Sequence, residues 1–173
     1  AEAERKAKQA EAQAEATSIW NTPASALEAT QPSVGEHPYI KRKGIMPHGV
    51  KVFRGSLSIG GMDCNGALMV PMKLNGKITS LQFINRDGEK RFYPNGEKGG
   101  YLIGKITPDA PICIAEGFAT GASIHEATGH AVVVAFDAGN LRKMAELLRA
   151  KYPDAVIVLC ADDDYQTEGN PGL

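Results

Sequence analysis

The chain has 173 residues, of which 43% are hydrophobic and 23% are charged, and its net charge is −1. This composition is typical of a soluble globular protein of one domain, or of one domain with a small appendage, and excludes a disordered chain, a collagen-like repeat and a disulfide scaffold. No apolar stretch approaches the roughly 20 residues that span a bilayer, and no signal peptide is visible, so we expect a cytoplasmic protein without a membrane partner. Because the sequence begins without Met, we expect it to be part of a longer chain.

Residues 1–20 are rich in Ala, Glu, Lys and Gln and contain neither Gly nor Pro. This predicts a helix whose apolar face is mostly Ala. The Thr-Pro pair that follows resembles an N-cap and a first helical position, which predicts a short helix over residues 23–30. Residues 37–45 favour one or two helical turns that end at Gly44.

Residues 50–106 favour short strands. Runs rich in β-branched and aromatic residues occur as VKVF, ALMVPM, KITSLQFIN and KRFYP. Asn-Gly or Asp-Gly pairs separate them at Asn65-Gly66, Asn75-Gly76, Asp87-Gly88 and Asn95-Gly96. Since such pairs are strong hairpin signals, we predict an antiparallel sheet built from hairpins.

From residue 111 the pattern alternates between buried strands and helices. PICIAEG, HAVVVAF and AVIVLC are continuously apolar, and residues 118–129 and 140–152 favour helices. Strands of this kind are covered on both faces, which predicts a parallel sheet in βαβαβ order with right-handed crossovers. We expect a further helix and strand to follow in the longer chain.

The charges divide along the chain in the same way. Residues 47–107 carry nine basic and four acidic side chains, and residues 108–173 carry four basic and ten acidic ones. This division predicts a basic surface that could hold a polyanion and an acidic surface that could hold cations. A chance scatter of solvated charges would give the same counts, so charge alone leaves both interpretations open.

Acidic residues end all three apolar strands. Glu116 follows the first strand, Asp137 the second, and the run Asp162-Asp163-Asp164 the third. Because ligands sit beyond the carboxyl ends of strands in a parallel sheet, we expect these carboxylates to meet at one edge. Two carboxylates about 4 Å apart repel by about 4 kcal/mol at an effective dielectric near 20, which favours a cation between them. Hard oxygen ligands suit Mg²⁺ or Mn²⁺.

Each of these residues also has a purely structural explanation. Asp at a strand end is a common helix N-cap, so Asp164 could cap a following helix and Glu116 could cap the helix after Gly117. Asp137 taken alone fits a helix cap better than a metal ligand. The spacing of Asp162 and Asp164 turns both carboxylates the same way on an extended segment, with Asp163 pointing elsewhere.

Other sequence signals for chemistry are weaker. The four histidines lack metal-ligand spacing, and no GxSxG, Walker A or GxGxxG sequence is present. Basic and aromatic residues adjoin in the run KRFY at 90–93, a pattern that suits stacking on single-stranded nucleic acid. A strand with one aromatic face in the core explains that run equally well.

The order of these motifs resembles the Toprim domain, which occurs in DnaG-type primases, topoisomerases and some nucleases. IAEGFATG, VVVAFDAGNL and IVLCADDD look like the primases of conjugative plasmids and satellite phages. Their Glu-Gly-aromatic-Ala-Thr motif matches residues 116–120, and their Asp-x-Asp motif matches Asp162 and Asp164. HPYIKRKGI, GALMVPM and SLQFINRDGEKRFYPNGEKGG resemble the basic lobe beside that domain. The similarity spans roughly residues 37–171, without a counterpart of the family's zinc-binding module.

The resemblance implies an α/β fold in three parts. These are a helical N-terminal linker (1–36), a small basic α+β subdomain that binds nucleic acid (37–107) and a Rossmann-like, parallel-sheet Toprim catalytic domain (108–173). The implied function is that of a DNA primase, a nucleotidyltransferase that makes short RNA primers during plasmid or phage replication or transfer. It would use a single-stranded DNA template, ribonucleoside triphosphates and Mg²⁺ or Mn²⁺. A replicative helicase, or a helicase domain in the full-length protein, is an expected partner.

The resemblance also assigns roles to residues. Glu116, Asp162 and Asp164 are the expected catalytic residues and, together with Asp137, the expected metal ligands, with Gly117, Asn140 and Asp163 in support. The expected template contacts are all basic: Lys41, Arg42, Lys43, Arg54, Lys90, Arg91 and Lys98. Two rival hypotheses remain, a Toprim nuclease or topoisomerase fragment and a non-catalytic module that binds single-stranded DNA.

Overall fold

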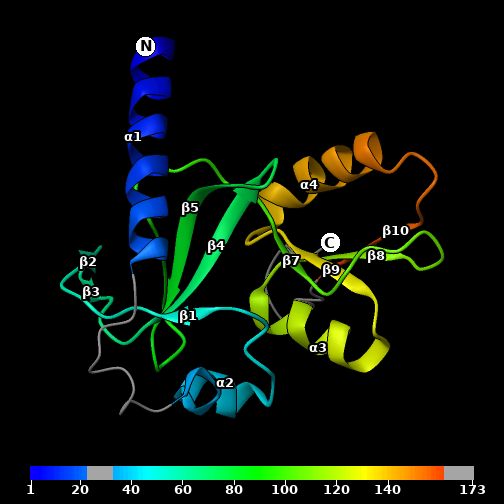
Figure 1. Ribbon diagram of the computed structural model, residues 1–173, viewed down its shortest axis with the longest axis horizontal. Coiled ribbons are helices and arrows are strands. Elements are labelled where there is room, and N and C mark those ends of the chain that lie inside the picture. Colours follow the sequence, from blue (N-terminus) through cyan, green and yellow to red (C-terminus); the bar gives the residue numbers. More distant parts are fainter. Residues whose placement is uncertain (23–32, 162–173) are drawn as a thin grey trace, which may run out of the picture. The chain divides into compact units, whose positions relative to one another are not determined.

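The computed structural model describes residues 1–22 and 33–161, and the chain divides into two compact units, Ala1–Gly99 and Gly100–Leu173 (Figure 1). Each unit contains its own four-stranded sheet. The helix predicted over residues 23–30 and the Asp162-Asp163-Asp164 run lie outside the described residues. Within the described ranges, no helix combines the length and apolar character needed to cross a membrane.

The sheet of the first unit is antiparallel throughout, with the strand order β1-β4-β5-β6. Its strands are β1 (Lys51–Val52), β4 (Leu68–Leu74), β5 (Lys77–Ile84) and β6 (Lys90–Phe92). A separate hairpin consists of β2 (Ser58–Ile59) and β3 (Met62–Asp63). The four predicted strands are therefore confirmed, whereas the β2–β3 hairpin is an addition that the sequence pattern did not indicate.

Two of the four predicted turn pairs close hairpins. Asn75 and Gly76 form the two-residue turn between β4 and β5, and their φ angles are 50° and 77°. This is the backbone of a type I′ turn, which asparagine and glycine tolerate at positive φ. The pair at 87–88 joins β5 to β6, while the other two pairs connect strands that do not pair with each other.

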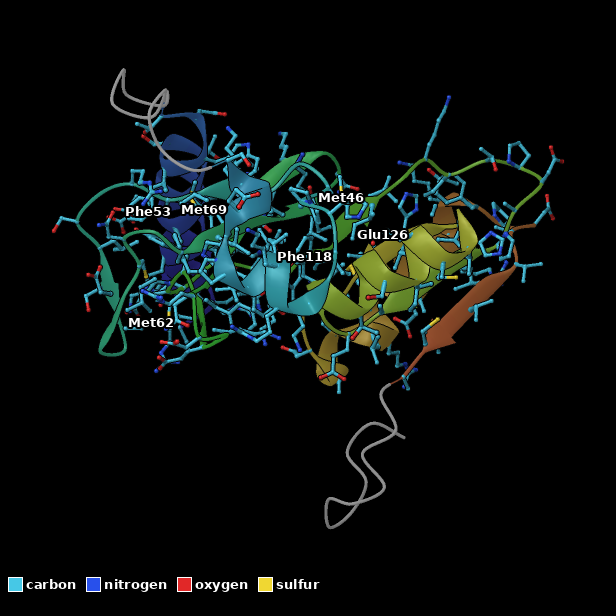
Figure 2. All side chains as sticks on the ribbon, turned by 90° about the horizontal axis from the view of Figure 1, so that it is seen from below. Met46, Phe53, Met62, Met69, Phe118 and Glu126 are labelled. Atoms are coloured by element: carbon cyan, nitrogen blue, oxygen red, sulfur yellow. The ribbon has the colours of Figure 1, made fainter. Side chains whose placement is uncertain are left out.

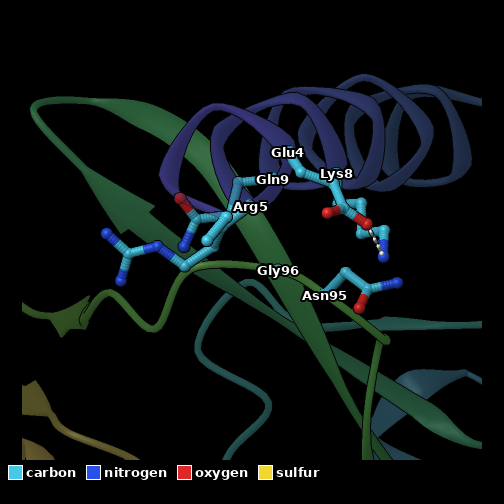
Figure 3. Close-up of a pocket in the computed structure, with 7 residues that line it drawn as sticks. Glu4, Arg5, Lys8, Gln9, Asn95 and Gly96 are labelled. Carbon is cyan, nitrogen blue, oxygen red and sulfur yellow. Dashed lines mark ion pairs between the residues drawn. The ribbon is translucent and has the colours of Figure 1, made fainter.

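Helix α1 (Glu2–Asn21) packs across β5 (Figure 1). Its buried residues are Ala12 and Ala16, so the alanine face predicted from the sequence is the face that meets the sheet. Near its start, α1 and the Asn95-Gly96 turn border a shallow hollow, whose lining includes Glu4 and Lys8 (Figure 3). Small side chains allow the helix backbone to lie close to the strand.

The core of the first unit lies between α1 and the sheet. Met62, Met69 and Phe83 are buried in one cluster, against which Phe53 and Trp20 pack (Figure 2). The rings of Phe53 and Phe83 meet edge to face with their centroids 5.5 Å apart, a favoured geometry for aromatic pairs. This cluster fixes the β2–β3 hairpin to the main sheet.

Strand β5 does not alternate between buried and exposed residues, because polar side chains on it are buried as well. Thr79 Oγ1 donates a hydrogen bond to the carbonyl of Glu97 (2.7 Å), and Ser80 Oγ donates one to the carbonyl of Tyr93 (3.4 Å). Buried hydroxyls are tolerated when they are paired in this way. The segment after β6 thus covers β5 and accounts for its irregular apolar pattern.

Two short helices precede this sheet, the 3₁₀ helix η2 (Val34–Glu36) and the α-helix α2 (Pro38–Lys43). Helix α2 ends at Gly44, whose φ of 64° is the left-handed cap that glycine adopts most readily. The end of this helix predicted from the sequence is therefore confirmed.

The sheet of the second unit has the strand order β10-β8-β9-β7. Its elements are β7 (Tyr101–Ile103), β8 (Ile112–Ala115), α3 (Phe118–Thr128), β9 (Ala131–Val134), α4 (Ala138–Lys151) and β10 (Ile157–Cys160). Strands β8, β9 and β10 are parallel, which confirms the predicted βαβαβ order, and β7 is an antiparallel edge strand that the sequence pattern did not indicate.

Strand β8 lies between β9 and β10, although it precedes both in the chain. The two crossovers, β8 to β9 and β9 to β10, run in opposite directions along the sheet, so right-handed connections put α3 and α4 on opposite faces. Figure 1 shows this arrangement. The order reverses between β8 and β10, which makes their carboxyl ends a topological switch point, where α/β sheets bind ligands.

Burial differs among the three parallel strands. Every residue of β8 and β9 is buried, whereas Val158 and Leu159 of β10 are 40% and 55% exposed. The expectation that all three strands are covered on both faces is therefore wrong for β10. This strand lies at the edge of the sheet, where the helices cover it less completely.

Candidate functional site

The carboxyl ends of the three parallel strands lie at one edge of the second sheet. Ala115, the last residue of β8, pairs with Cys160 at the end of β10 and with Val134 at the end of β9. The backbone N–H of Ala135 also donates to the carbonyl of Ala115 (2.8 Å). The segments that follow each strand therefore leave the sheet from the same level.

Glu116 follows β8 directly and is half-buried. Helix α3 begins at Phe118, and its N-cap is Gly117, which has no side chain to accept a capping hydrogen bond. Glu116 is therefore not the N-cap of α3, which removes the structural explanation considered for it above. Phe118 is buried beneath this segment, with its ring 6.3 Å from that of Tyr101, and it anchors the start of the helix (Figure 2).

The glycine that ends the EGFATG motif lets α3 approach the sheet closely. A Cβ atom at Gly121 would lie 2.9 Å from Cγ2 of Val134 and 3.4 Å from Cγ1 of Val132. Both valines belong to β9. Because real Cβ atoms do not come so close to a neighbour, the small residue sets the distance between helix and strand, and with it the position of the segment that carries Glu116.

Asp137 caps helix α4. Its Oδ1 accepts a hydrogen bond from the backbone N–H of Asn140 (2.9 Å), which is the capping role considered for a strand-end aspartate. Asn140 is buried, and its Nδ2 donates to the carbonyl of Ala135 (2.9 Å). Together these bonds hold the first turn of α4 against the end of β9.

A strained residue precedes this cap. Phe136 has a φ of 75°, in the left-handed region that bulky residues rarely adopt, and its side chain is buried. Such strain persists only when the surrounding structure enforces it, and it concentrates at functional sites. The sequence gives no signal for it, because phenylalanine is an ordinary strand residue.

The third acidic position, Asp162-Asp163-Asp164, begins two residues after the end of β10 and lies outside the described residues. Across residues 1–22 and 33–161, no group of three or more His, Cys, Asp or Glu side chains is placed to hold a metal ion. The predicted metal set thus remains a prediction that joins two described carboxylates, Glu116 and Asp137, to two that lie outside the described residues, Asp162 and Asp164.

The basic residues of α2 surround a buried tyrosine. Arg42 and Lys43 lie over the ring of Tyr39, with the guanidinium carbon 5.7 Å and the ammonium nitrogen 5.9 Å from its centroid. Lys41 pairs with Glu36. Burial raises the pKa of Tyr39, so the ring stays neutral and can attract both cations. These three residues are exposed, as expected, and their role in binding nucleic acid stays a prediction.

The other predicted template contacts differ in how firmly the protein holds them. The guanidinium of Arg91 donates to the carbonyls of Gly60 and Lys90 and pairs with Glu89, so it fastens the tip of the β2–β3 hairpin. Lys98 lies over the ring of Phe92, 5.0 Å from its centroid. Arg54 and Lys90 are exposed.

The sequence of this chain is similar to a domain family and to two known proteins. Residues 111–171 match the Toprim domain family. Two proteins of Escherichia coli, each named DNA primase TraC, are similar to the chain. One is 36% identical over 178 residues, which is 96% of this chain and 16% of the relative, and the other is 35% identical over 145 residues, which is 78% of this chain and 10% of the relative. The chain thus spans less than a fifth of the length of either relative.

No solved structure matches the chain. The fold and the sequence matches nevertheless agree on the second unit, since the matched residues begin at β8 and include both crossovers. Residues 111–171 of this chain therefore match the Toprim domain family, and the predicted resemblance of the chain to Toprim primases is confirmed.

Proposed function

We propose that this chain is the catalytic part of a DNA primase, a nucleotidyltransferase that joins ribonucleotides into short primers on single-stranded DNA. The Toprim domain and the similarity to DNA primase TraC support primase function. The process served would be replication or transfer of a plasmid or phage genome in the cytoplasm, in cooperation with a helicase.

One observation carries this proposal furthest, namely the register between β8 and β10. Ala115 pairs with Cys160, so the backbone that leads to Glu116 and the backbone that leads to Asp162 leave the sheet side by side. They do so at the topological switch point, where a ligand of an α/β sheet is expected. Carboxylates from positions 116, 162 and 164 can therefore converge on one ligand.

The donor chemistry of these positions fits a divalent cation. Glu116 is half-buried at the strand end, and it is not used as the N-cap of α3. Toprim domains generally bind divalent metals such as Mg²⁺. Glu116, Asp162 and Asp164 would hold Mg²⁺ or Mn²⁺, since carboxylate oxygens are the donors that these hard ions prefer. When bound, such an ion polarises the α-phosphate and neutralises charge on the departing pyrophosphate.

The protein side chains then have distinct roles in the proposed reaction. Asp162 and Asp164 are ligands, and Glu116 either shares the ion or accepts the proton of the attacking 3′-hydroxyl group. Gly117 and Asn140 support the site by fixing the start of α3 and of α4, and Asp163 is proposed as a further supporting residue. Phosphoryl transfer depends on positioning and charge stabilisation, so no Ser, Cys or His nucleophile is needed.

The first unit would hold the template. The proposed contacts are Lys41, Arg42, Lys43, Arg54, Lys90, Arg91 and Lys98. Contacts between these cations and phosphates give binding that depends on salt and little on sequence. Arg91 is the least available of the seven, because its guanidinium already holds Gly60 and Glu89.

The test is primer synthesis on single-stranded DNA with ribonucleotides, in this chain and in the full-length protein that contains it. Glu116→Gln should lower synthesis by at least about 100-fold, since it removes both the charge and the proton acceptor. Glu126→Gln, an exposed carboxylate on α3, is the matched control and should keep wild-type activity (Figure 2). Equal activity in the two variants would contradict the proposal, and degradation of DNA without nucleotides would favour a nuclease instead.

A further inference from the structure

A cleft of about 630 Å³ lies wholly within the first unit and is distinct from the acidic edge of the second. Three segments far apart in the sequence form its walls: the start of α2 with η2, the segment from Gly61 to Ala67, and the β5–β6 turn from Asn85 to Glu89. Val52 and Arg54 complete the lining. A volume of this size is typical of a site for a small ligand.

His37 ties two of these walls together. Its Nδ1 accepts a hydrogen bond from the backbone N–H of Tyr39 (3.2 Å), and its Nε2 donates to the carbonyl of Gly66 (3.1 Å). The side chain is buried and is also the N-cap of α2. The neutral imidazole therefore links α2 to the Asn65-Gly66 turn. This link holds two walls of the cleft in place before any ligand binds.

Three guanidinium groups lie close enough to His37 to act on its charge. Arg54 and Arg86 line the cleft, and Arg42 donates from Nη1 to the carbonyl of Arg86 (3.0 Å). Burial lowers the pKa of His37, and the charges of Arg54, Arg42 and Arg86 lower it further. Among the residues that the structure describes, no carboxylate pairs with the guanidinium of Arg54 or of Arg86.

The carboxylates that line the cleft are mostly engaged elsewhere. Glu36 pairs with Lys41, and Glu89 pairs with Arg91. Oδ1 of Asp63 accepts the backbone N–H of Asn65 (2.9 Å). Asp87 is the remaining acidic residue of the lining. Asp63 and Asp87 keep their charges in the lining, but none of the four carboxylates forms an ion pair with Arg54 or Arg86 among the described residues.

Apolar groups line the cleft beside the arginines. Val52, Met62, Pro38 and Ala67 all contribute to its surface. A ligand that matches this lining needs an anionic group for the guanidinium forks and an apolar body for the remaining wall. Arginine is well suited to hold phosphate oxygens through two parallel hydrogen bonds.

We propose that this cleft binds one nucleoside phosphate unit of the single-stranded template, with its phosphate on Arg54 and Arg86 and its sugar or base against Val52 and Met62. The sequence patterns did not single out Arg86 or His37. The inference rests on the proposed function for the identity of the strand, but it concerns binding alone and needs no catalysis. A wild-type protein that binds single-stranded DNA but makes no primers would refute the proposed function and leave the cleft proposal untouched.

The experiment measures fluorescence anisotropy of a labelled 16-nucleotide oligothymidylate with wild type and with Arg54→Ala/Arg86→Ala, across a series of salt concentrations. Both arginines are exposed, so the variant should fold normally. Its Kd should rise on the order of tenfold, and the slope of log K against log salt should shrink by about 1.4, since two phosphate contacts to a single strand are removed. The control Lys73→Ala/Lys77→Ala removes the same charge at the opposite end of the β4–β5 hairpin, where both lysines are exposed.

Comparing the two variants distinguishes a specific binding site in the cleft from nonspecific electrostatic attraction between DNA and basic side chains. Weak binding in Arg54→Ala/Arg86→Ala with near-normal binding in the lysine control supports the cleft. Equal losses in both variants, or no loss in either, would overturn it. A second arm titrates fluorescent N-methylanthraniloyl-ATP in place of the oligonucleotide. If only this titration is weakened by the arginine substitutions, the nucleoside phosphate site holds and its ligand is the free nucleotide.

Discussion

Each of the two units of this chain contains a four-stranded sheet, but the two sheets differ in strand direction and in the charges that they carry. The first unit, residues 1–99, carries 14 basic and 10 acidic side chains on an antiparallel framework, and the second, residues 100–173, carries 5 basic and 10 acidic ones on a mainly parallel framework. An antiparallel sheet returns through tight turns, so its polar groups gather in turns and short helices. A parallel sheet sends every strand end to one edge, so residues distant in sequence meet there.

On this difference rests the proposal that the first unit binds the template and the second carries the chemistry. The cleft beside His37 is built from turns and contains guanidinium groups. The edge beside Glu116 is built from strand ends, and the proposal is that carboxylates of the residues after β10 join Glu116 there. Variants that change primer synthesis without changing template binding, or the reverse, test this division between the two units.

The largest effect is expected from Asp162→Asn/Asp164→Asn. Removing two proposed metal ligands should lower primer synthesis on the order of 10³-fold, because the developing charge on the phosphates loses its compensation. Binding of the 16-nucleotide oligothymidylate should change less than about twofold, since the carboxylates do not attract a polyanion. Template binding that falls in parallel with synthesis would contradict the division between the units.

The next largest effect is expected in the core of the first unit. Phe83 is fully buried against Phe53, so Phe83→Ala should lower the free energy of unfolding by about 3–5 kcal/mol. Trp20 is the only tryptophan and packs against the same cluster, so its fluorescence during denaturation by urea reports on this unit. Met46→Ala, at a side chain that is 63% exposed, is the control and should stay within about 0.5 kcal/mol of wild type.

A smaller, pH-dependent effect is expected at His37. Burial lowers the pKa of His37 in the folded protein below its ordinary value of 6.5, so the unfolded chain takes up a proton more readily. The contribution of neutral His37 to stability is therefore fully present above pH 6.5, and it is lost as the pH drops from 6.5 towards the pKa of His37 in the folded protein. Protonation would also remove the Nδ1 acceptor that caps α2. Urea denaturation at pH 7.5 and 5.5 measures this loss.

Two substitutions separate capping from titration at this position. His37→Asn keeps an acceptor for the backbone N–H of Tyr39 and should lose the acid sensitivity that His37 contributes. His37→Ala should lose that sensitivity as well, and should be less stable by about 1 kcal/mol at pH 7.5. A His37→Asn variant that keeps the full acid sensitivity of wild type would show that another group is responsible.

The smallest effect is expected at Asp137, whose Oδ1 caps α4. Asp137→Ala should lower the free energy of unfolding by about 1 kcal/mol, and Asp137→Asn should restore most of it, because asparagine caps equally well. Thermal denaturation measures both. A lower Mn²⁺ affinity in Asp137→Asn at unchanged stability would add this residue to the metal ligands.

Local chemistry explains which parts of the fold the sequence predicts. The Asn75-Gly76 turn, the Gly44 cap of α2 and the apolar strands β8 and β9 each depend on the preferences of a few neighbouring residues, and all were predictable. Strand β7 is only three residues long, and its pairing with β9 depends on a partner about 30 residues away. No local pattern specifies such a strand.

The candidate sites divide in the same way. The sequence pointed to Glu116 because a buried strand ending in Glu-Gly is a recognisable motif, and its grouping with Asp162 and Asp164 stays a prediction to which the parallel pairing of β8 and β10 adds support. The sequence did not point to His37 and Arg86, because their meeting around the cleft depends on the packing of α2 against distant turns. The positive φ of Phe136 was equally invisible, since it arises from the connection between β9 and the cap of α4.

The most direct test of the central claim is calorimetric titration of Mn²⁺ into the wild-type protein, Glu116→Gln and Asp162→Asn/Asp164→Asn. If carboxylates from the ends of β8 and β10 share one ion, both variants should bind Mn²⁺ at least about tenfold more weakly than wild type, because each loses charged oxygen ligands. Glu126→Gln should bind it as wild type does. Unchanged Mn²⁺ affinity in both site variants would contradict a shared metal site at this edge of the sheet, and with it the proposed catalytic role.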